Sequence, residues 1–425
     1  MSRSAASLVG ALLVGLIAVS CTARVPPIDA GRTPFTPSPE ERRLWSEAER
    51  EEESLLTRVT IYEDPRLDEY LGRVAAKLTP GDVGPDGPVI KLVVLRDPTL
   101  AAFAMPEGRV FLHTGLLSRL ENEAQLATIL GHEVTHVYER HYLVFSGGGD
   151  SAKILNKLRD TVTSLGTPPS AIVDRRDQFV GAAVLSRTAN AILGLGLKIA
   201  AVTAINGYGR DLERQADVGG MAALVRAGYD PKESLKLFKL LRDEAAGRGP
   251  LEAFFYGNPA RLQESFDVAL HQLRKVYGED AKRTDLVKST DDFEERMRAV
   301  VRENAALDIQ AGRFPLAKKQ LERVLKASPK DAIAHLYDGE LHRLQSQRAK
   351  SKAERDTESR MARESYEQSA ALDPAYPDPF RQLGLLYYQQ KEPAQARAAF
   401  ERYLALKPDA ADAKRVREYL GELER

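Results

Sequence analysis

The sequence predicts an α+β protein in which a mainly helical domain with a small β-sheet precedes an all-α domain of tetratricopeptide-like repeats. Three observations lead to this prediction. Short β-rich stretches occur early in the chain, long helical patterns follow them, and the last third repeats with the tetratricopeptide period. A length of 425 residues suggests two or three domains, each large enough to bury a core.

The composition is that of a globular chain and excludes several classes of protein. Hydrophobic residues make up 43% and charged residues 29%, and 61 Lys and Arg balance 61 Asp and Glu. Because the chain lacks the basic excess that binding to nucleic-acid phosphates needs, we expect no nucleic-acid partner. A single cysteine excludes a disulfide framework within the chain and a cysteine-rich zinc site.

The N-terminal segment indicates an export signal that ends at a lipidation site. Arg3 supplies a positive charge, and the apolar run over residues 5–20 is short for a membrane span. The run ends in Ala-Val-Ser before Cys21, which resembles a bacterial lipobox, although the usual first leucine is alanine. We therefore predict a lipoprotein signal peptide over residues 1–21; the alternative is a plain secretory signal. Residues 22–40 contain five prolines and are predicted to form an extended tether.

Strand and helix patterns follow in order. Residues 90–95 and 109–113 are rich in β-formers, and the Met-Pro-Glu-Gly sequence between them supplies turn residues. Residues 41–56 carry a loose helical stripe, and a longer helical pattern begins after Asn122. Residues 179–205 are apolar but interrupted by basic residues, which favours one or two buried helices over a membrane span.

The last third of the chain shows the tetratricopeptide period. Pro374 and Pro408 are separated by one such period, and the interval from Pro329 to Pro374 exceeds one period by the length of a short charged insertion. In the last unit we expect two paired helices that contain Phe380, Leu383, Gly384 and Tyr387, and then Ala396 and Phe400. We predict a repeat domain over residues 298–425; the alternative is an unrelated helical tail.

The sequence His132-Glu133-Val134-Thr135-His136 carries the strongest chemical signal. Residues four apart lie about 40° apart around a helix, so both imidazoles face one point and can bind one metal ion. Zinc lowers the pKa of a bound water to roughly 7, and Glu133 can take the proton of that water as general base. The pattern predicts a zinc-dependent hydrolase; the alternative is a chance match.

A tetrahedral catalytic zinc takes three protein ligands, so a third ligand is needed. On a continuous helix, His141 lies nine residues after His132 and faces away from it, and the third-histidine position of the metzincins holds Tyr142. The remaining option is a glutamate on a later helix. Glu213 is the best candidate because Asp217 follows on the same face and can accept the outer N–H of a ligand histidine. The alternative is an exposed, charged helix that binds no metal.

Three segments in this order resemble the gluzincin peptidases typified by CAAX prenyl endopeptidase and the heat-shock protease HtpX, which form peptidase family M48. They are residues 102–108 (Ala-Phe-Ala-Met-Pro-Glu-Gly), 131–136 (Gly-His-Glu-Val-Thr-His) and 213–217 (Glu-Arg-Gln-Ala-Asp). With an export signal and C-terminal repeats, the architecture is similar to that of the periplasmic β-barrel-assembly-enhancing proteases. The resemblance predicts a zinc metallopeptidase domain over residues 41–293.

The resemblance also implies roles for individual residues. One zinc ion per chain would be bound by His132, His136 and Glu213. Glu133 would be the general base and acid, and Asp217 would orient a ligand histidine. The edge of the active site, where an extended peptide adds by β-augmentation, would be the strand of Arg109, Val110, Phe111 and Leu112.

The chain departs from the family pattern in one loop. The family often has His-Pro and then an arginine after the catalytic helices, whereas this chain has Asn258-Pro259, with Glu264 in the expected place of the arginine. Relatives use this loop for gating or to stabilise the reacting oxyanion. The departure therefore bears on the strength and regulation of catalysis.

The main hypothesis is a zinc endopeptidase of the cell envelope. It would cleave envelope or outer-membrane proteins and peptides, with Glu133 assisting the attack of water on the peptide bond. The protein would be exported and lipid-anchored in the periplasm, at the outer membrane of a Gram-negative bacterium. The alternative is a metal-bound chaperone or adaptor of envelope assembly that works through its repeats with little or no proteolysis. The complete metal-binding pattern favours the first hypothesis, and the missing loop histidine favours the second.

Overall fold

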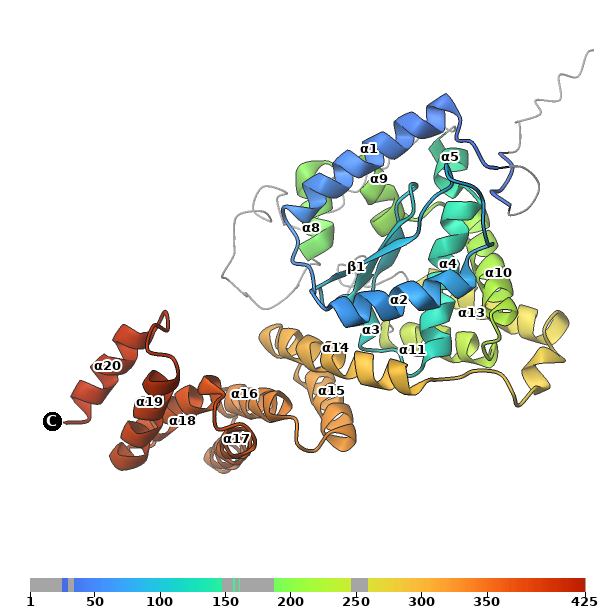
Figure 1. Ribbon diagram of the computed structural model, residues 1–425. Coiled ribbons are helices and arrows are strands. Elements are labelled where there is room, and N and C mark those ends of the chain that lie inside the picture. The colour runs from blue at the N-terminus through green and yellow to red at the C-terminus, as the bar shows by residue number, and fades with distance from the viewer. Residues whose placement is uncertain are drawn as a thin grey trace, which may run out of the picture.

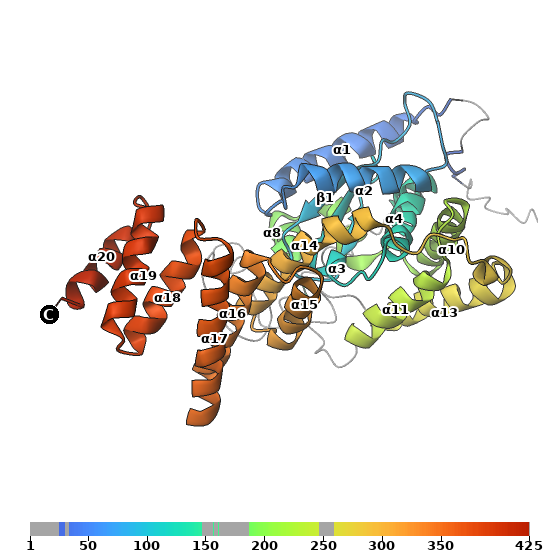
Figure 2. The ribbon, with the colours of Figure 1, turned by 60° about the horizontal axis from the view of Figure 1, so that its bottom comes forward.

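The structure, a computed structural model, describes residues 25–29, 34–146, 187–245 and 259–424, together with residues 156 and 160. The predicted signal peptide with Cys21, and Asn258, lie outside the described residues. A helical domain surrounds a three-stranded sheet, and a row of helical hairpins extends from one side of it (Figures 1 and 2). This architecture confirms the predicted fold class. Within the described part, no helix has the length and apolarity needed to cross a membrane.

The sheet has the order β1-β3-β2, formed by β1 (Lys91–Leu95), β2 (Ala102–Ala104) and β3 (Arg109–His113). β3 pairs with β1 in parallel and with β2 antiparallel. The turn into β3 requires Gly108, because its φ is +107° and a Cβ there would lie 2.7 Å from the carbonyl oxygen of Val89. Both predicted strands are confirmed. The short β2 was not predicted, because three residues are too few to show alternation.

Two apolar cores cover the two faces of the sheet. Successive side chains of β3 point in opposite directions, so Val110 and Leu112 join one core and Phe111 joins the other. The first core includes α2 (Pro65–Leu78) and α4 (Glu123–Tyr138). The second includes α1 (Pro39–Leu56), α8 (Arg187–Leu195) and α9 (Lys198–Ala201), which lie across the sheet from α2 in Figure 1.

The domain contains several further helices. They are α3 (Thr114–Leu117), α5 (His141–Ser146), the π-helix η1 (Val202–Asn206), α10 (Arg210–Arg226), α11 (Lys232–Ala245), α13 (Pro259–Lys275) and the 3-10 helix η2 (Asp280–Lys282). In its described part, the segment predicted over residues 179–205 forms buried helices, as expected. Helices α4 and α10 carry the predicted functional residues and lie side by side in Figures 1 and 2.

In its described part, the predicted tether over residues 22–40 packs against the sheet domain. Ile28 is only 3% exposed and belongs to the first core, and its N–H donates to the carbonyl oxygen of Tyr138 at 2.8 Å. The N–H of Phe35 donates to Val83 O at 2.9 Å, and α1 begins at Pro39 with a capping box formed by Ser38 and Glu41. Proline content indicated an extended backbone but could not show that this backbone packs against the domain.

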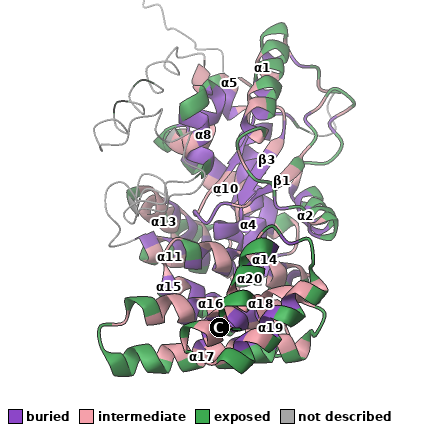
Figure 3. Cartoon of the chain, turned by 90° about the vertical axis from the view of Figure 1, so that its left-hand side faces the viewer, coloured by how far each residue is buried: buried purple, intermediate pink, exposed green. Residues whose placement is uncertain are grey.

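The repeats form helical hairpins that stack in a row. Their helices are α14 (Asp291–Gln310), α15 (Phe314–Ala327), α16 (Ala332–Arg348), α17 (Lys352–Leu372), α18 (Pro377–Gln389), α19 (Pro393–Leu406) and α20 (Ala413–Glu422). A Cβ on Gly339 would lie 2.4 Å from the Tyr366 ring, and one on Gly384 would lie 2.4 Å from the Phe400 ring. Glycine therefore permits the close pairing in both hairpins. The charged insertion lengthens α17, whose positions are mostly exposed (Figure 3).

Helix α14 joins the two parts of the molecule. Its first half, with Phe293 and Met297, packs into the first core of the sheet domain, and Val301 and Ile309 pack into the core of the first repeat hairpin. The predicted boundary between residues 293 and 298 thus falls inside one continuous helix. At this junction the carboxylate of Asp308, which is fully buried, is surrounded by donors from Arg119, Arg313, Asn304 and Gln320. The first hairpin is therefore fixed to the sheet domain by buried apolar and polar contacts.

Candidate metal centre

Helices α4 and α10 approach each other closely because glycines lie at their contact. A Cβ on Gly131 of α4 would lie 2.9 Å from Gly220 O, and a Cβ on Gly220 of α10 would lie 2.8 Å from the backbone nitrogen of His132. Larger residues there would separate the two backbones. The close approach lets Glu213 and Asp217, one helical turn apart on α10, reach the histidines of α4.

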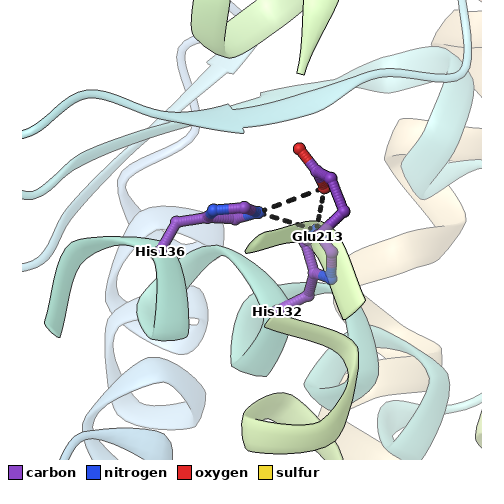
Figure 4. Close-up of side chains that lie close together, drawn as sticks. All are labelled: His132, His136 and Glu213. Carbon is purple, nitrogen blue, oxygen red and sulfur yellow. Dashed lines mark hydrogen bonds and ion pairs between the residues drawn. The ribbon is translucent and has the colours of Figure 1, made fainter. Parts of the chain in front are cut away.

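Three potential ligand atoms converge between these helices, as Figure 4 shows. Nε2 of His132 lies 3.0 Å from Nε2 of His136 and 3.5 Å from Oε2 of Glu213, and His136 Nε2 lies 3.4 Å from the same oxygen. Zinc bonds of roughly 2.0–2.1 Å in a tetrahedron hold ligand atoms about 3.3 Å apart. Oε2 of Glu213, the oxygen that faces both imidazoles, is buried and also forms an ion pair with Arg261. The three residues therefore fit a zinc ion, and the structure brings together the set that the sequence predicted.

Each potential ligand is held by a second residue. Nδ1 of His132 lies 2.9 Å from a carboxylate oxygen of Asp217, whose other oxygen accepts from the Ser265 hydroxyl at 2.8 Å. A carboxylate at Nδ1 favours the tautomer that leaves Nε2 free for a metal. The backbone N–H of Tyr208 donates to Oε1 of Glu213 at 2.7 Å, so only Oε2 points toward the histidines. Asp217 thus lies where the sequence placed it.

His141 lies beside the site rather than away from it, which corrects the expectation drawn from a continuous helix. Helix α4 ends at Tyr138, and Arg140 takes a positive φ of 57°, which redirects the chain before α5 begins at His141. Nδ1 of His141 then lies 2.8 Å from Nδ1 of His136. Burial lowers the pKa of His141 to about 4, so the ring is neutral at pH 7 and can accept the Nδ1–H of His136. His141 therefore orients a potential ligand.

Glu133 lies beside the same site, under the edge of the sheet that β2 forms. Its side chain is buried, which raises its pKa, and a hydrogen bond from the backbone of Ala104 in β2 acts in the opposite direction. β2 is the edge strand on this side, whereas β3 lies between β1 and β2. The expectation that Arg109, Val110, Phe111 and Leu112 form the edge is therefore wrong, because the backbone of β3 pairs on both sides within the described sheet.

Arg261 is a residue of the site that the sequence did not single out. Its guanidinium forms an ion pair with Glu213, and Nη2 lies 3.4 Å from Nε2 of His132. A Cβ on Gly207, where φ is +72°, would lie 2.7 Å from Nη1 of Arg261, so glycine leaves room for this side chain. Glu264, at the position where the family pattern has arginine, pairs with Arg210 at 3.0 Å. The family pattern thus identified the loop, but the arginine that reaches the site is Arg261, three residues before Glu264.

Comparison with known proteins now defines the family. The model of peptidase family M48 matches residues 63–302, which is more than half of the chain. The chain belongs to peptidase family M48. A tetratricopeptide-repeat model matches residues 350–421. Both matches confirm the resemblance seen in the sequence, and the first confirms that the domain around the sheet is of the metallopeptidase type.

Several curated relatives are similar over part of their length. The β-barrel assembly-enhancing protease of Escherichia coli K12 is 25% identical over 298 residues, which cover 64% of this chain and 57% of the relative. The protein of that name from Yersinia pestis is 29% identical over 182 residues, covering 43% of this chain and 34% of the relative. Mitochondrial metalloendopeptidase OMA1 of Schizosaccharomyces pombe is 30% identical over 174 residues, covering 40% of this chain and 43% of the relative. The chain thus spans less than two thirds of the length of these relatives.

Proposed function

We propose that this chain is a zinc-dependent endopeptidase that cleaves exposed or misassembled proteins of the bacterial cell envelope. The observation that carries the proposal is the convergence of His132, His136 and Glu213 in a chain of family M48, with Glu133 beside them. The envelope substrate has support from the signal-like N-terminal run and from relatives named β-barrel assembly-enhancing protease.

Each group at the site would have a separate role in hydrolysis. Zinc bound by the three ligands would supply Lewis-acid chemistry, polarising the scissile carbonyl and lowering the pKa of a water to roughly 7. Glu133 would accept the proton of the attacking water and pass it to the leaving amine. Arg261 brings a positive charge next to the ligand atoms, where it would stabilise negative charge that develops on the substrate.

The outer edge of β2 pairs with no strand among the described residues, and it offers a place for an extended substrate. His113 N donates to Ala101 O at 3.0 Å, and Met105 N donates to Arg109 O at 2.7 Å, so residues 101 and 105 bond to β3. Alternation in an antiparallel pair then turns the backbone groups of Ala102 and Ala104 away from β3, toward the side on which Glu133 lies. We infer that a substrate strand adds to this edge.

Unfolded casein tests the proposal. The soluble protein that begins at Thr22, loaded with zinc, should cut casein, and a chelator should stop cleavage until zinc is restored. The repeats favour the second candidate function, a metal-bound chaperone or adaptor, which predicts that casein stays intact while its aggregation is suppressed. If casein stays intact and its aggregation is suppressed, the protein is a chaperone or adaptor and not an endopeptidase.

We also propose that the protein is exported to the periplasm and anchored to the outer membrane through lipid on Cys21. Support comes from the position of this cysteine, the single one in the chain, directly after the apolar run. Two acyl chains hold a soluble domain stably, whereas one gives only marginal binding.

Cys21→Ala should therefore release the protein from membranes while zinc binding is unchanged. Fractionation of cells that express each form, with zinc content measured on both, checks this expectation. If the variant remains with the membranes as the parent does, the protein is held by another feature.

A further inference from the structure

The chain leaves the sheet domain toward Cys21 at the C-terminal end of α4. Nη1 of Arg140 donates to Pro26 O at 3.1 Å, and the backbone of Ile28 is bonded to that of Tyr138. Arg140 is itself held by Glu41 of α1, with nitrogen–oxygen distances of 2.8 and 2.6 Å. Residues 26–28 therefore have a fixed position on the domain, next to α5 (Figure 1).

Only a short stretch of chain separates this point from the predicted lipid. Cys21 lies five residues before Pro26, and five fully extended residues span at most about 18 Å. A tether that was free over the whole of residues 22–40 would reach several times farther. The docked segment thus limits how far the domain can move from a membrane that holds Cys21.

The metal centre lies near the same end of α4. His136 comes two residues before Tyr138, about 3 Å along the helix axis. Arg140, which holds Pro26, also lines a small pocket together with His136, Ala104 and Tyr208. The chain therefore leaves the domain on the same side of the molecule as the metal centre and the outer edge of β2.

Two exposed apolar side chains occur around this helix end. Val89 is 63% exposed and follows Pro88, whose carbonyl oxygen accepts from the Tyr138 hydroxyl at 3.5 Å. Val144 of α5 is 41% exposed, and its N–H donates to Arg140 O. Val89 and Val144 thus expose apolar surface at the end of the domain from which the chain leaves.

We propose that the α4–α5 end of the sheet domain lies against the bilayer surface, and that the site acts on polypeptide segments close to that surface. This inference rests on the proposed endopeptidase activity and on the lipid at Cys21. The occupant of this face is a phospholipid surface, because the chain that leaves it is too short to let the domain turn away. Substrates would be envelope proteins whose exposed segments emerge next to the membrane.

Vesicles that carry both enzyme and substrate test the inference. The same fluorogenic peptide is displayed either directly on a lipid or on a helical spacer of about 40 residues, which is roughly 60 Å tall. The lipid-anchored protein should cut the membrane-proximal peptide at least about tenfold faster than the raised one, because the short tether limits its reach. A matched variant with a Gly/Ser insertion of about 40 residues between Ala23 and Arg24 should cut both at similar rates. Soluble Cys21→Ala protein should also show no preference.

Other outcomes separate this inference from the proposals on which it rests. Equal cleavage of both peptides by the anchored protein, or preference for the raised peptide, would overturn the membrane-facing arrangement while leaving the peptidase intact. Failure of the parent protein to bind vesicles would overturn it as well. Loss of all cleavage, including that of casein in solution, would instead remove the endopeptidase itself.

Discussion

Replacing Glu133 by glutamine should reduce peptide cleavage by roughly 10²–10⁴-fold while zinc remains bound. The amide has nearly the shape of the carboxylate but cannot accept a proton from water. It also leaves the three ligand atoms of His132, His136 and Glu213 in place. The measurement is kcat/KM on a fluorogenic peptide, with zinc content determined on the same samples.

A matched control makes this result specific. Glu121→Gln carries the same chemical change at an exposed position just before α4 and should keep full activity. If Glu133→Gln cleaves as fast as the control, Glu133 is not the general base. If it instead loses zinc together with activity, its role is to hold the site rather than to move a proton.

Asp308→Ala should lower the free energy of unfolding by about 3–5 kcal/mol, the usual cost of removing one partner from a buried charged cluster. Asp308 is fully buried, and it lies 3.5 Å from Nη1 of Arg119 and 2.6 Å from Nε of Arg313. Without it, Arg119 keeps Glu244 as an acidic partner, at 2.9 Å. Urea unfolding followed by circular dichroism measures the change.

The exposed pair of Asp285 with Arg283 supplies the control, because surface ion pairs contribute little. Asp285→Ala should leave the urea midpoint unchanged. An unchanged midpoint for Asp308→Ala as well would show that the junction between the sheet domain and the repeats does not depend on this carboxylate.

Sequence patterns predicted the features that depend on local periodicity. The helix of His132 and His136 and the acidic pair of Glu213 and Asp217 each show a spacing of four, which places both members on one face of a helix. The repeats were predicted from the tetratricopeptide period, because each unit of that length forms one helical hairpin. Gly384 and Phe400 were correctly placed at one helix contact because a repeat brings the same positions together each time.

The remaining features depend on how the chain turns and on which segments meet. His141 reaches His136 because helix α4 ends at Tyr138. A projection of the sequence onto one continuous helix does not show where the helix ends. Arg261 reaches the site from α13, across a tertiary contact that no spacing encodes. The edge strand was misassigned because the sheet order places β3 between β1 and β2, and pairing partners are not visible in one short apolar run.

The central claim is that His132, His136 and Glu213 hold a zinc ion, and zinc content measures it most directly. Purified protein should contain one zinc per chain, and Glu213→Ala should lose most of it, because two histidines cannot close a tetrahedral site. Glu264→Ala removes a glutamate from a nearby helix that pairs with Arg210 and should keep the metal. Full zinc occupancy in Glu213→Ala, or a zinc-free parent protein that still cleaves casein, would contradict the account.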